Sequence, residues 1–260
     1  VGAAAINPGP RAQITAALER AARECGYTGG FSVIISTENG EELAKQTYNG
    51  HLGVVGGLSI LGTSGVVEPM SEKALVDTIL LELDSLYAGG QRTAFLCPGN
   101  YGADFARDTL GLDLEKAVKC SNFIGEALDH AVFRGFDDIL LVGHAGKLVK
   151  LAAGVMNTHS SVADGRQEIF TAHAALCGAG RDTLEGLMQS ISVDACIELL
   201  DRENLREPVL ARIESEIEKR LALRLRGRGH VEFILFTAKY GILAQSPGAM
   251  ALCERLRESK

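Results

Sequence analysis

Apolar residues recur at intervals of three and four in several segments of the chain, which predicts amphipathic helices. The first segment covers residues 11–25, where Ile14, Leu18 and Cys25 share one face. Further helices are expected at residues 71–87, 103–110, 121–133, 147–153, 165–177, 183–190, 194–202 and 207–225. Ser121 has the side chain of a good N-cap, and Gly135 is expected to end the helix that Ser121 begins.

Short apolar and β-branched runs lie between these helices and predict strands. They cover residues 31–37, 58–61, 93–97, 118–120, 139–142 and 231–236. Asn39-Gly40 after the first run is typical of a hairpin turn, with residues 41–48 as the returning strand.

From residue 57 onward, strands and helices alternate. This order favours right-handed crossovers and an α/β fold of three layers, in which helices flank a mostly parallel sheet. Residues 1–56 have an α+β pattern and are short for a domain of their own. The expected organisation is therefore a smaller α+β section over residues 1–56, followed by an α/β ligand-binding domain over residues 57–260.

Composition narrows the class of protein. The 260 residues include 30 glycines, no tryptophan, and 26 basic against 33 acidic side chains, for a net charge of −7. An acidic balance disfavours a nucleic-acid or anionic-membrane partner, and no apolar run reaches the ~20 residues of a membrane span. The first residues lack the features of a signal peptide. The six cysteines are scattered, as expected for reduced thiols of a cytoplasmic protein rather than for a zinc site or disulfide framework.

Each predicted strand of the second section leads into a cluster of glycine and small polar residues. The clusters are Gly62-Thr63-Ser64-Gly65, Pro98-Gly99-Asn100-Tyr101-Gly102, Ser121-Asn122, Gly143-His144-Ala145-Gly146-Lys147 and Thr237–Gly241. Turns from strands to helices are often rich in glycine, which would explain any one cluster. Their repetition favours a ligand crevice, because open α/β sheets bind ligands outside the carboxyl ends of their strands.

Common phosphate and metal motifs are absent from the sequence. Gly146-Lys147 is followed by Leu148 and is no Walker A loop, and no G-x-G-x-x-G follows a strand. A G-x-S-x-G nucleophile elbow is also absent. His144, His159 and His173 are too loosely spaced for a helical metal pair, so no metal bound by the protein is expected.

Lys147 and Lys150 lie on one face near a predicted helix start, where the helix dipole disfavours cations. They are either a solvated pair or the holders of an anion. The polar segment 157–168 follows, in which Asp164 is a candidate cap for the helix that carries Arg166. His159 and Arg166 are further candidates for ligand contacts.

These motifs identify a family resemblance that runs along nearly the whole chain. The matching segments are Ala5–Arg11, Thr47–Asn49, Leu58–Glu72, Pro98–Gly102, Ser121–Gly125, Val142–Lys150, Thr158–Ser160 and Ala163–Glu168. In them the sequence resembles the cobalt-precorrin-5B C1-methyltransferases, the CbiD family of anaerobic cobalamin biosynthesis. The resemblance implies S-adenosylmethionine as methyl donor and a cobalt-bearing, multiply carboxylated tetrapyrrole as acceptor, so that cobalt enters only with the substrate.

The same resemblance implies that family members have a longer N-terminus. Residues 1–56 are therefore expected to be the C-terminal remnant of a small domain.

Methyl transfer from a sulfonium to a carbon depends mainly on positioning, which a shaped crevice supplies. We expect Gly62, Thr63, Ser64, Gly65, Gly99, Asn100, Gly102 and Gly143 to cradle the donor. Lys147, Lys150 and Arg166, with Asp164, are expected at the substrate carboxylates. His144 or His159 is the candidate base for a proton of the macrocycle, because imidazole titrates near neutral pH.

Two other functions remain open at this stage. A non-catalytic corrinoid-binding or scaffold protein of the same pathway would bind the tetrapyrrole without the donor. An unrelated nucleotide-using α/β enzyme is disfavoured by the failed phosphate motifs. The sequence makes no prediction of the oligomeric state.

Overall fold

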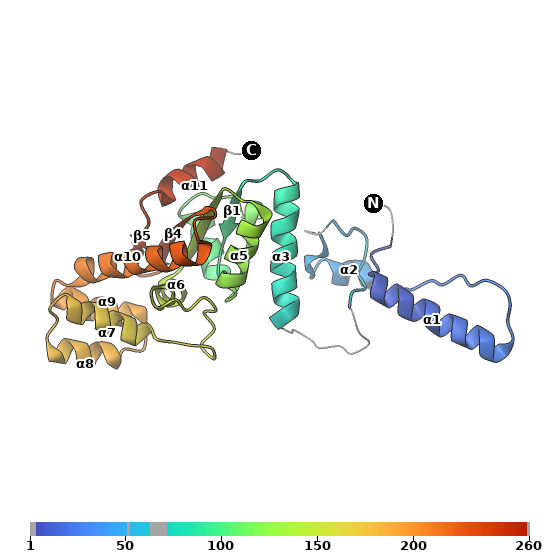
Figure 1. Ribbon diagram of the computed structural model, residues 1–260, viewed down its shortest axis with the longest axis horizontal. Coiled ribbons are helices and arrows are strands. Elements are labelled where there is room, and N and C mark those ends of the chain that lie inside the picture. Colours follow the sequence, from blue (N-terminus) through green and yellow to red (C-terminus); the bar gives the residue numbers. More distant parts are fainter. Residues whose placement is uncertain (1–3, 51–52, 63–71, 259–260) are drawn as a thin grey trace. The chain divides into compact units, whose positions relative to one another are not determined.

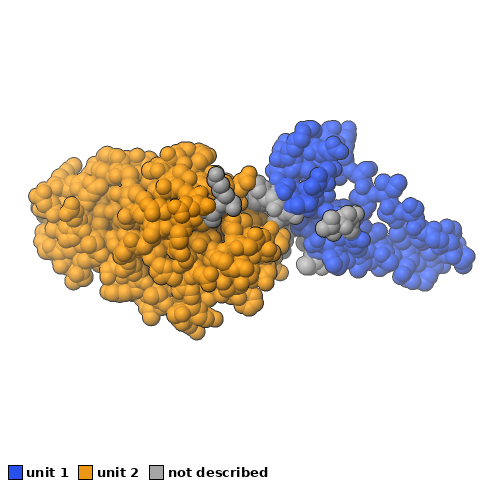
Figure 2. All heavy atoms as spheres, turned by 90° about the horizontal axis from the view of Figure 1, so that it is seen from above, with its two compact units in different colours: residues 1–71 blue, residues 72–260 orange. Residues whose placement is uncertain are grey.

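The protein is described by a computed structural model, which covers residues 4–50, 53–62 and 72–258. The chain divides into two compact units, Val1–Ser71 and Glu72–Lys260 (Figure 2). The boundary expected between residues 56 and 57 lies earlier than this division.

Unit 1 consists of three helical elements in its described part. They are α1 (Pro8–Cys25), α2 (Gly40–Ala44) and the 3-10 turn η1 (Tyr48–Gly50). The expected helix over residues 11–25 is confirmed as α1, which Gly26 ends in the left-handed conformation. No residue of α1 is buried.

The prediction of a hairpin over residues 31–48 is wrong. Residues 31–36 belong to no helix or strand, and α2 occupies the place of the returning strand. Phe31, Val33, Ile34 and Ile35 are all exposed, the third of them by 89%. An apolar β-branched run forms a stable strand only when a neighbouring strand and a covering layer bury it, and unit 1 supplies neither within its described residues.

The strand expected at residues 58–61 does not join the sheet of the second unit. Ile60 instead forms an isolated parallel bridge with Ile6. The N–H of Asn7 donates to the carbonyl of Ile60 at 2.8 Å, and the N–H of Ile60 donates to that of Ala5 at 2.8 Å. Residues 58–61 therefore belong to unit 1, which is why the division falls later than expected.

Unit 2 is built on one five-stranded sheet, in agreement with the α/β class predicted from the sequence (Figure 1). Its strands are β1 (Thr93–Leu96), β2 (Ala117–Val118), β3 (Asp138–His144), β4 (His230–Thr237) and β5 (Gly241–Gln245). Their order is β2-β1-β3-β4-β5. The first four run parallel, and β5 is antiparallel to β4.

Helices cover both faces of this sheet, which confirms the three-layer α/β class. The core on one face is shared by α3 (Glu72–Ala88), α5 (Ile124–Arg134), α7 (Arg166–Leu176), α8 (Arg181–Met188), α9 (Val193–Arg202) and α10 (Arg206–Leu225). Within it, α7 and α9 pack on α10, and α8 packs on α7 and α9. The other face packs on α4 (Asn100–Asp108) and α11 (Ala249–Glu258). Ile139 and Leu141 point into the first layer, whereas Leu140 and Val142 point into the second. None of the helices in the described ranges is long and apolar enough to span a bilayer.

Two local predictions in unit 2 need correction. Ser121 is not an N-cap: its φ is +50°, and α5 begins at Ile124 after Phe123. The N–H of Cys120 instead donates to the carbonyl of Cys97, the residue after β1, at 3.1 Å, and the N–H of Phe123 donates to the carbonyl of Cys120 at 2.9 Å. The sequence pattern also missed β5 and α11.

Candidate active site

The strand order of unit 2 creates a switch point between β1 and β3. The chain leaves β1 through α4 on one face to reach β2, and leaves β3 through α6 (Ala145–Leu148) and the helices up to α10 on the other face to reach β4. Connections that depart to opposite faces leave a crevice outside the carboxyl ends of the two strands, where α/β proteins bind their ligands. The segments after Cys97 and after Val142, both predicted from sequence to contact a ligand, meet at this edge.

The α4 side of the crevice begins at Gly99. This residue is the N-cap of α4 and has a φ of +95°, which an L side chain rarely adopts. The N–H of Ala103 donates back to the carbonyl of Gly99, so the amides of residues 100–102 have no acceptor within the helix. Lys119 donates to Oδ1 of Asn100 at 3.4 Å. The start of α4 therefore presents backbone donors beside a lysine.

Gly102 and Gly143 serve close packing at this edge. A Cβ on Gly102 would lie 2.7 Å from the carbonyl oxygen of Val142. A Cβ on Gly143 would lie 2.8 Å from Cγ of Pro98 and 2.9 Å from Cγ of Leu148. Protein atoms, rather than open space, thus occupy the room left by both missing side chains.

Lys147 reaches toward the switch point from α6 (Ala145–Leu148), which follows β3 directly. Its Nζ donates to the carbonyl of Ser121 at 3.3 Å and lies 3.4 Å from where a Cβ on Gly99 would be. Burial is the main cause that lowers the pKa of this lysine. No ion pair joins it to a carboxylate in the part of the chain that is described, so its charge is available to a ligand.

His144 ends β3 and caps α6. Its Nδ1 accepts the N–H of Gly146 at 3.1 Å. The ring is in edge contact with Phe236 (5.7 Å between centroids) and lies 6.2 Å from the ring of Tyr101. Burial lowers the pKa of His144, with a further lowering from Arg166 and an opposing effect of Asp194.

Lys150 does not face the crevice as its sequence position next to Lys147 suggests. It is 3% exposed, and its Nζ donates to the carbonyls of Ala163 at 2.9 Å and Thr158 at 3.2 Å. Its third neighbour is the Asp164 carboxylate, 3.6 Å away. Lys150, which belongs to the 3-10 turn η3 (Val149–Ala153), therefore holds the loop that precedes α7.

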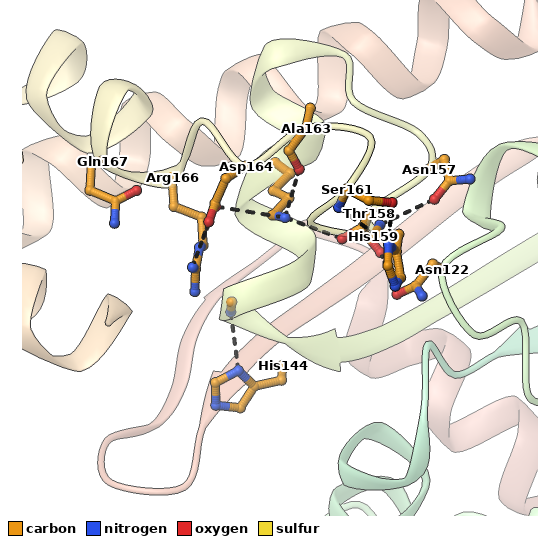
Figure 3. A network of polar contacts seen from close by, with 12 residues as sticks. Asn122, His144, Asn157, Thr158, His159, Ser161, Ala163, Asp164, Arg166 and Gln167 are labelled. Atoms are coloured by element: carbon orange, nitrogen blue, oxygen red, sulfur yellow. Dashed lines mark hydrogen bonds and ion pairs between the residues drawn. The ribbon is translucent and has the colours of Figure 1, made fainter. Parts of the chain in front are cut away.

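Asp164 and Arg166 form a bidentate ion pair (Figure 3). Nε of Arg166 donates to Oδ1 at 2.5 Å, and Nη2 donates to Oδ2 at 2.7 Å. The guanidinium is the main cause that lowers the pKa of Asp164 to about 2. The expected capping role of Asp164 is wrong, because Gly165 is the N-cap of α7 and the carboxylate is turned toward Arg166.

His159 lies on the same loop, apart from His144 (Figure 3). Its Nδ1 accepts the N–H of Ser161 at 3.2 Å, and the Ser161 hydroxyl is 2.6 Å from the same nitrogen. Thr158 anchors this part of the loop through Asn122, which its hydroxyl contacts at 3.3 Å. The structure thus separates the two candidate bases.

The predicted donor site is only partly described. Gly62 is the last described residue of that segment of unit 1, whereas Thr63, Ser64 and Gly65 lie outside the described residues. Gly99, Asn100, Gly102 and Gly143 come together at the switch point of unit 2.

The buried thiols do not supply a nucleophile at this edge. Burial raises the pKa of Cys97 well above its usual range, and raises that of Cys120 to about 12. Within residues 4–50, 53–62 and 72–258, no three histidine, cysteine or acidic side chains gather as a metal site would require.

Sequence reasoning missed two residues of the site. Tyr101, in the first turn of α4, is 77% exposed beside His144, and an exposed tyrosine in a glycine-rich turn was a usable signal. Asp194 of α9 is far away in sequence, and its buried Oδ1 has no hydrogen-bond partner in the described structure. Its approach to His144 depends on how α9 packs, which no local pattern reveals.

Comparisons with known proteins agree with the family resemblance. The family model for CbiD matches residues 1–69, and the model for the CbiD C-terminal domain matches residues 157–247. The chain is 51% identical over 237 residues to a cobalt-precorrin-5B C(1)-methyltransferase of Ruminiclostridium cellulolyticum, covering 91% of this chain and 62% of that protein. It is 41% identical over 260 residues to the protein of that name from Photorhabdus laumondii, covering 99% of this chain and 68% of that protein.

A solved structure is also similar in sequence. The crystal structure of the cobalamin biosynthesis protein CbiD from Archaeoglobus fulgidus is 30% identical, covers 61% of this chain and 50% of that chain, and has a TM-score of 0.24. The chain thus spans 62% and 68% of the lengths of the two curated relatives.

Proposed function

The chain belongs to the CbiD family, and from that membership we propose that it carries the S-adenosylmethionine-dependent methylation of C1 of cobalt-precorrin-5B, which gives cobalt-precorrin-6A. The observation that carries the proposal is the 41% identity to a protein of this name over 99% of the chain. The charge and shape of the edge formed by β1 and β3 support it.

The methyl group passes directly from sulfur to carbon, and no covalent intermediate with the protein is needed. The electron pair of the acceptor carbon forms the new carbon–carbon bond, the carbon–sulfur pair stays on sulfur, and the macrocycle releases a proton. The protein's part is to hold donor and acceptor in line. Cobalt belongs to the substrate, so we propose no metal site in the protein.

We assign the donor to the start of α4. A donor contact of the Gly62–Gly65 segment, of which only Gly62 is described, stays a prediction from the sequence. The amides of residues 100–102 offer backbone donors at the start of α4, whereas the missing side chains of Gly102 and Gly143 let α4 and β3 approach each other. Lys147 and Arg166 are assigned to substrate carboxylates. Lys150 and Asp164 do not contact the substrate in this proposal but position Arg166 and its loop, since their charges are paired within the protein.

Lys147 provides a direct test, because its ammonium has no carboxylate partner among the residues that the structure describes. Lys147→Ala is expected to weaken binding of the tetrapyrrole by about 10- to 100-fold, which is the range for a lost charge-assisted hydrogen bond, and to spare binding of the donor. Isothermal titration with each ligand measures both. Lys219→Ala is the matched control, because Lys219 lies on the exposed face of α10 and pairs with Glu216. Equal tetrapyrrole affinity in Lys147→Ala and the parent chain would remove Lys147 from this role.

The methyl transfer itself is tested anaerobically with cobalt-precorrin-5B and S-adenosylmethionine labelled on the methyl group. The chain and a full-length family member are compared, and transfer of label to the tetrapyrrole is the expected result. A protein that binds the tetrapyrrole but neither binds the donor nor transfers label would be the non-catalytic corrinoid carrier. The expected cytoplasmic location stays a prediction.

A further inference from the structure

His144 and Arg166 converge on the start of α6. A Cβ on Gly146 would lie 3.1 Å from Nδ1 of His144 and 3.9 Å from Nη1 of Arg166. Figure 3 shows the side chain of Arg166 extending toward the side on which the ring of His144 lies. A side chain at residue 146 would therefore enter the space between the two groups.

The backbone determines which nitrogen of His144 carries the proton. An N–H can only donate, so Nδ1, which receives the Gly146 amide, is the acceptor. The neutral ring therefore carries its proton on Nε2. Burial is the main cause that lowers the pKa of His144, against the opposing effect of Asp194, and this direction favours the neutral ring with its N–H donor.

Arg166 has donors left on one side of its guanidinium. Nε and Nη2 are bound to Asp164, whereas Nη1 has no hydrogen-bond partner in the described structure. Asp164 is in turn held by the buried ammonium of Lys150. The ion pair with Asp164 thus fixes the orientation of the guanidinium, and Nη1 is the nitrogen that faces Gly146.

The charges among the side chains of this corner balance, because Lys150 and Arg166 are positive and Asp164 and Asp194 are negative. What remains for a ligand is a pair of donors, Nε2–H of His144 and Nη1–H of Arg166, which have no acceptor in the described structure. An anion with two acceptor oxygens would satisfy both donors together.

We propose that His144 and Arg166 bind one carboxylate, with His144 as a hydrogen-bond donor and not as the base. The assignment rests on the proposed function for the identity of the ligand, because both the tetrapyrrole and the amino-acid part of the donor carry carboxylates. Lys150 and Asp164 are positioning residues for Arg166.

The test measures the affinity of the whole chain for two separate probes, uroporphyrin I and S-adenosylmethionine. The first is a tetrapyrrole with carboxylates around its ring, and its fluorescence reports binding without any methyl transfer. His144→Asn keeps a cap acceptor for the Gly146 amide but removes the distal donor. Arg166→Met removes the guanidinium, and Arg166→Lys serves as a second variant that keeps the charge.

We expect His144→Asn and Arg166→Met each to lower the affinity for one probe by about 10-fold or more, the loss of one hydrogen bond to a charged group. The probe that loses affinity identifies the source of the carboxylate. His144→Gln, which retains a distal N–H, is expected to recover part of the loss. Arg181→Met is the matched control, since Arg181 forms an exposed ion pair with Glu185 on α8. Circular dichroism melting checks that each variant is folded.

The pH profile separates a donor from a charged or basic histidine. A neutral donor predicts that affinity stays constant from about pH 6.5 to 8, whereas an imidazolium would lose affinity about tenfold per unit. Asp194 of α9, Arg166 of α7 and Tyr101 of α4 are the titratable or charged groups around the ring. Unchanged affinity for both probes in His144→Asn and Arg166→Met would overturn the proposal, as would the imidazolium profile. If the variants lose probe affinity while the parent chain transfers no methyl group in the labelled assay, that result would uphold the carboxylate site and contradict the proposed function.

Discussion

Two apolar, β-branched runs adopt different structures in the two units. Phe31–Ile35 of unit 1 forms no strand and is exposed at both its aromatic and its β-branched positions. Ile139–Val142 of unit 2 is the middle of β3 and is fully buried. The second run has β1 on one side, β4 on the other and helices over both faces. A strand pattern therefore predicts a strand only where the rest of the chain supplies neighbours.

The helices of the two units repeat this contrast. The stripe of Ile14 and Leu18 on α1 buries no residue, although the periodicity predicted the helix correctly. The stripe of α10 buries Val209, Leu210, Ile213, Ile217, Leu221 and Leu225. Periodicity is a local property and survives in both units, whereas burial depends on packing partners.

The largest difference between the units is expected on truncation of the two apolar runs. Leu141→Ala in β3 should lower the free energy of unfolding by about 2–5 kcal/mol, because it leaves a cavity in a fully buried layer. Ile34→Ala in unit 1 should change it by less than about 0.5 kcal/mol, since the side chain is already exposed. Urea denaturation monitored by circular dichroism measures both. A comparable loss in Ile34→Ala would mean that the first run is packed after all.

A smaller difference is expected when a methyl group is added to a glycine in each unit. Gly143→Ala should destabilise unit 2 by about 1–3 kcal/mol, because the new Cβ would overlap Pro98 and Leu148. Gly30→Ala meets no atom within 4 Å and should be neutral or slightly stabilising. The midpoint of thermal unfolding reports the change. An unaffected Gly143→Ala would show that the turn between β3 and α6 can yield.

The smallest difference concerns one ion pair from each unit. The pKa of Asp164 is lowered to about 2 in the fold, below the value of about 3.9 in unfolded chains. Its stabilising contribution is therefore complete above about pH 4 and is lost as the pH falls toward 2. Asp164→Asn should flatten this acid branch by less than about 1 kcal/mol, because solvent screens the pair.

Glu42→Gln is the corresponding change in unit 1, where Glu42 and Lys45 are both exposed. It should change the free energy of unfolding at neutral pH by less than about 0.5 kcal/mol, because an exposed pair contributes little. Urea denaturation at neutral pH measures this change, and unfolding free energies from pH 5 to 2 measure the effect of Asp164→Asn. Identical acid branches in Asp164→Asn and the parent chain would contradict the assignment.

The sequence predicted which segments meet at the sheet edge better than it predicted how their side chains are oriented. The clusters after β1 and β3 were expected to meet, and the strand order brings them together. Lys147 and Lys150 were expected to act side by side. In the structure the first lies at the edge and the second is buried beneath the loop at Thr158 and Ala163. That loop comes after both lysines, so helical spacing alone did not reveal that it takes up the second ammonium.

The local sequence pattern by itself determined which segments form helices, which apolar run becomes β3, and that glycine-rich turns follow the strands. These properties depend on residues a few positions apart, and so a single sequence contains them. Tertiary structure alone decided that Ile60 pairs with Ile6, that Phe31–Ile35 stays exposed, and that Asp164 binds Arg166 instead of capping α7. Each of these outcomes is a competition among distant partners for one backbone or one charge, and the free energy of the packed chain settles it.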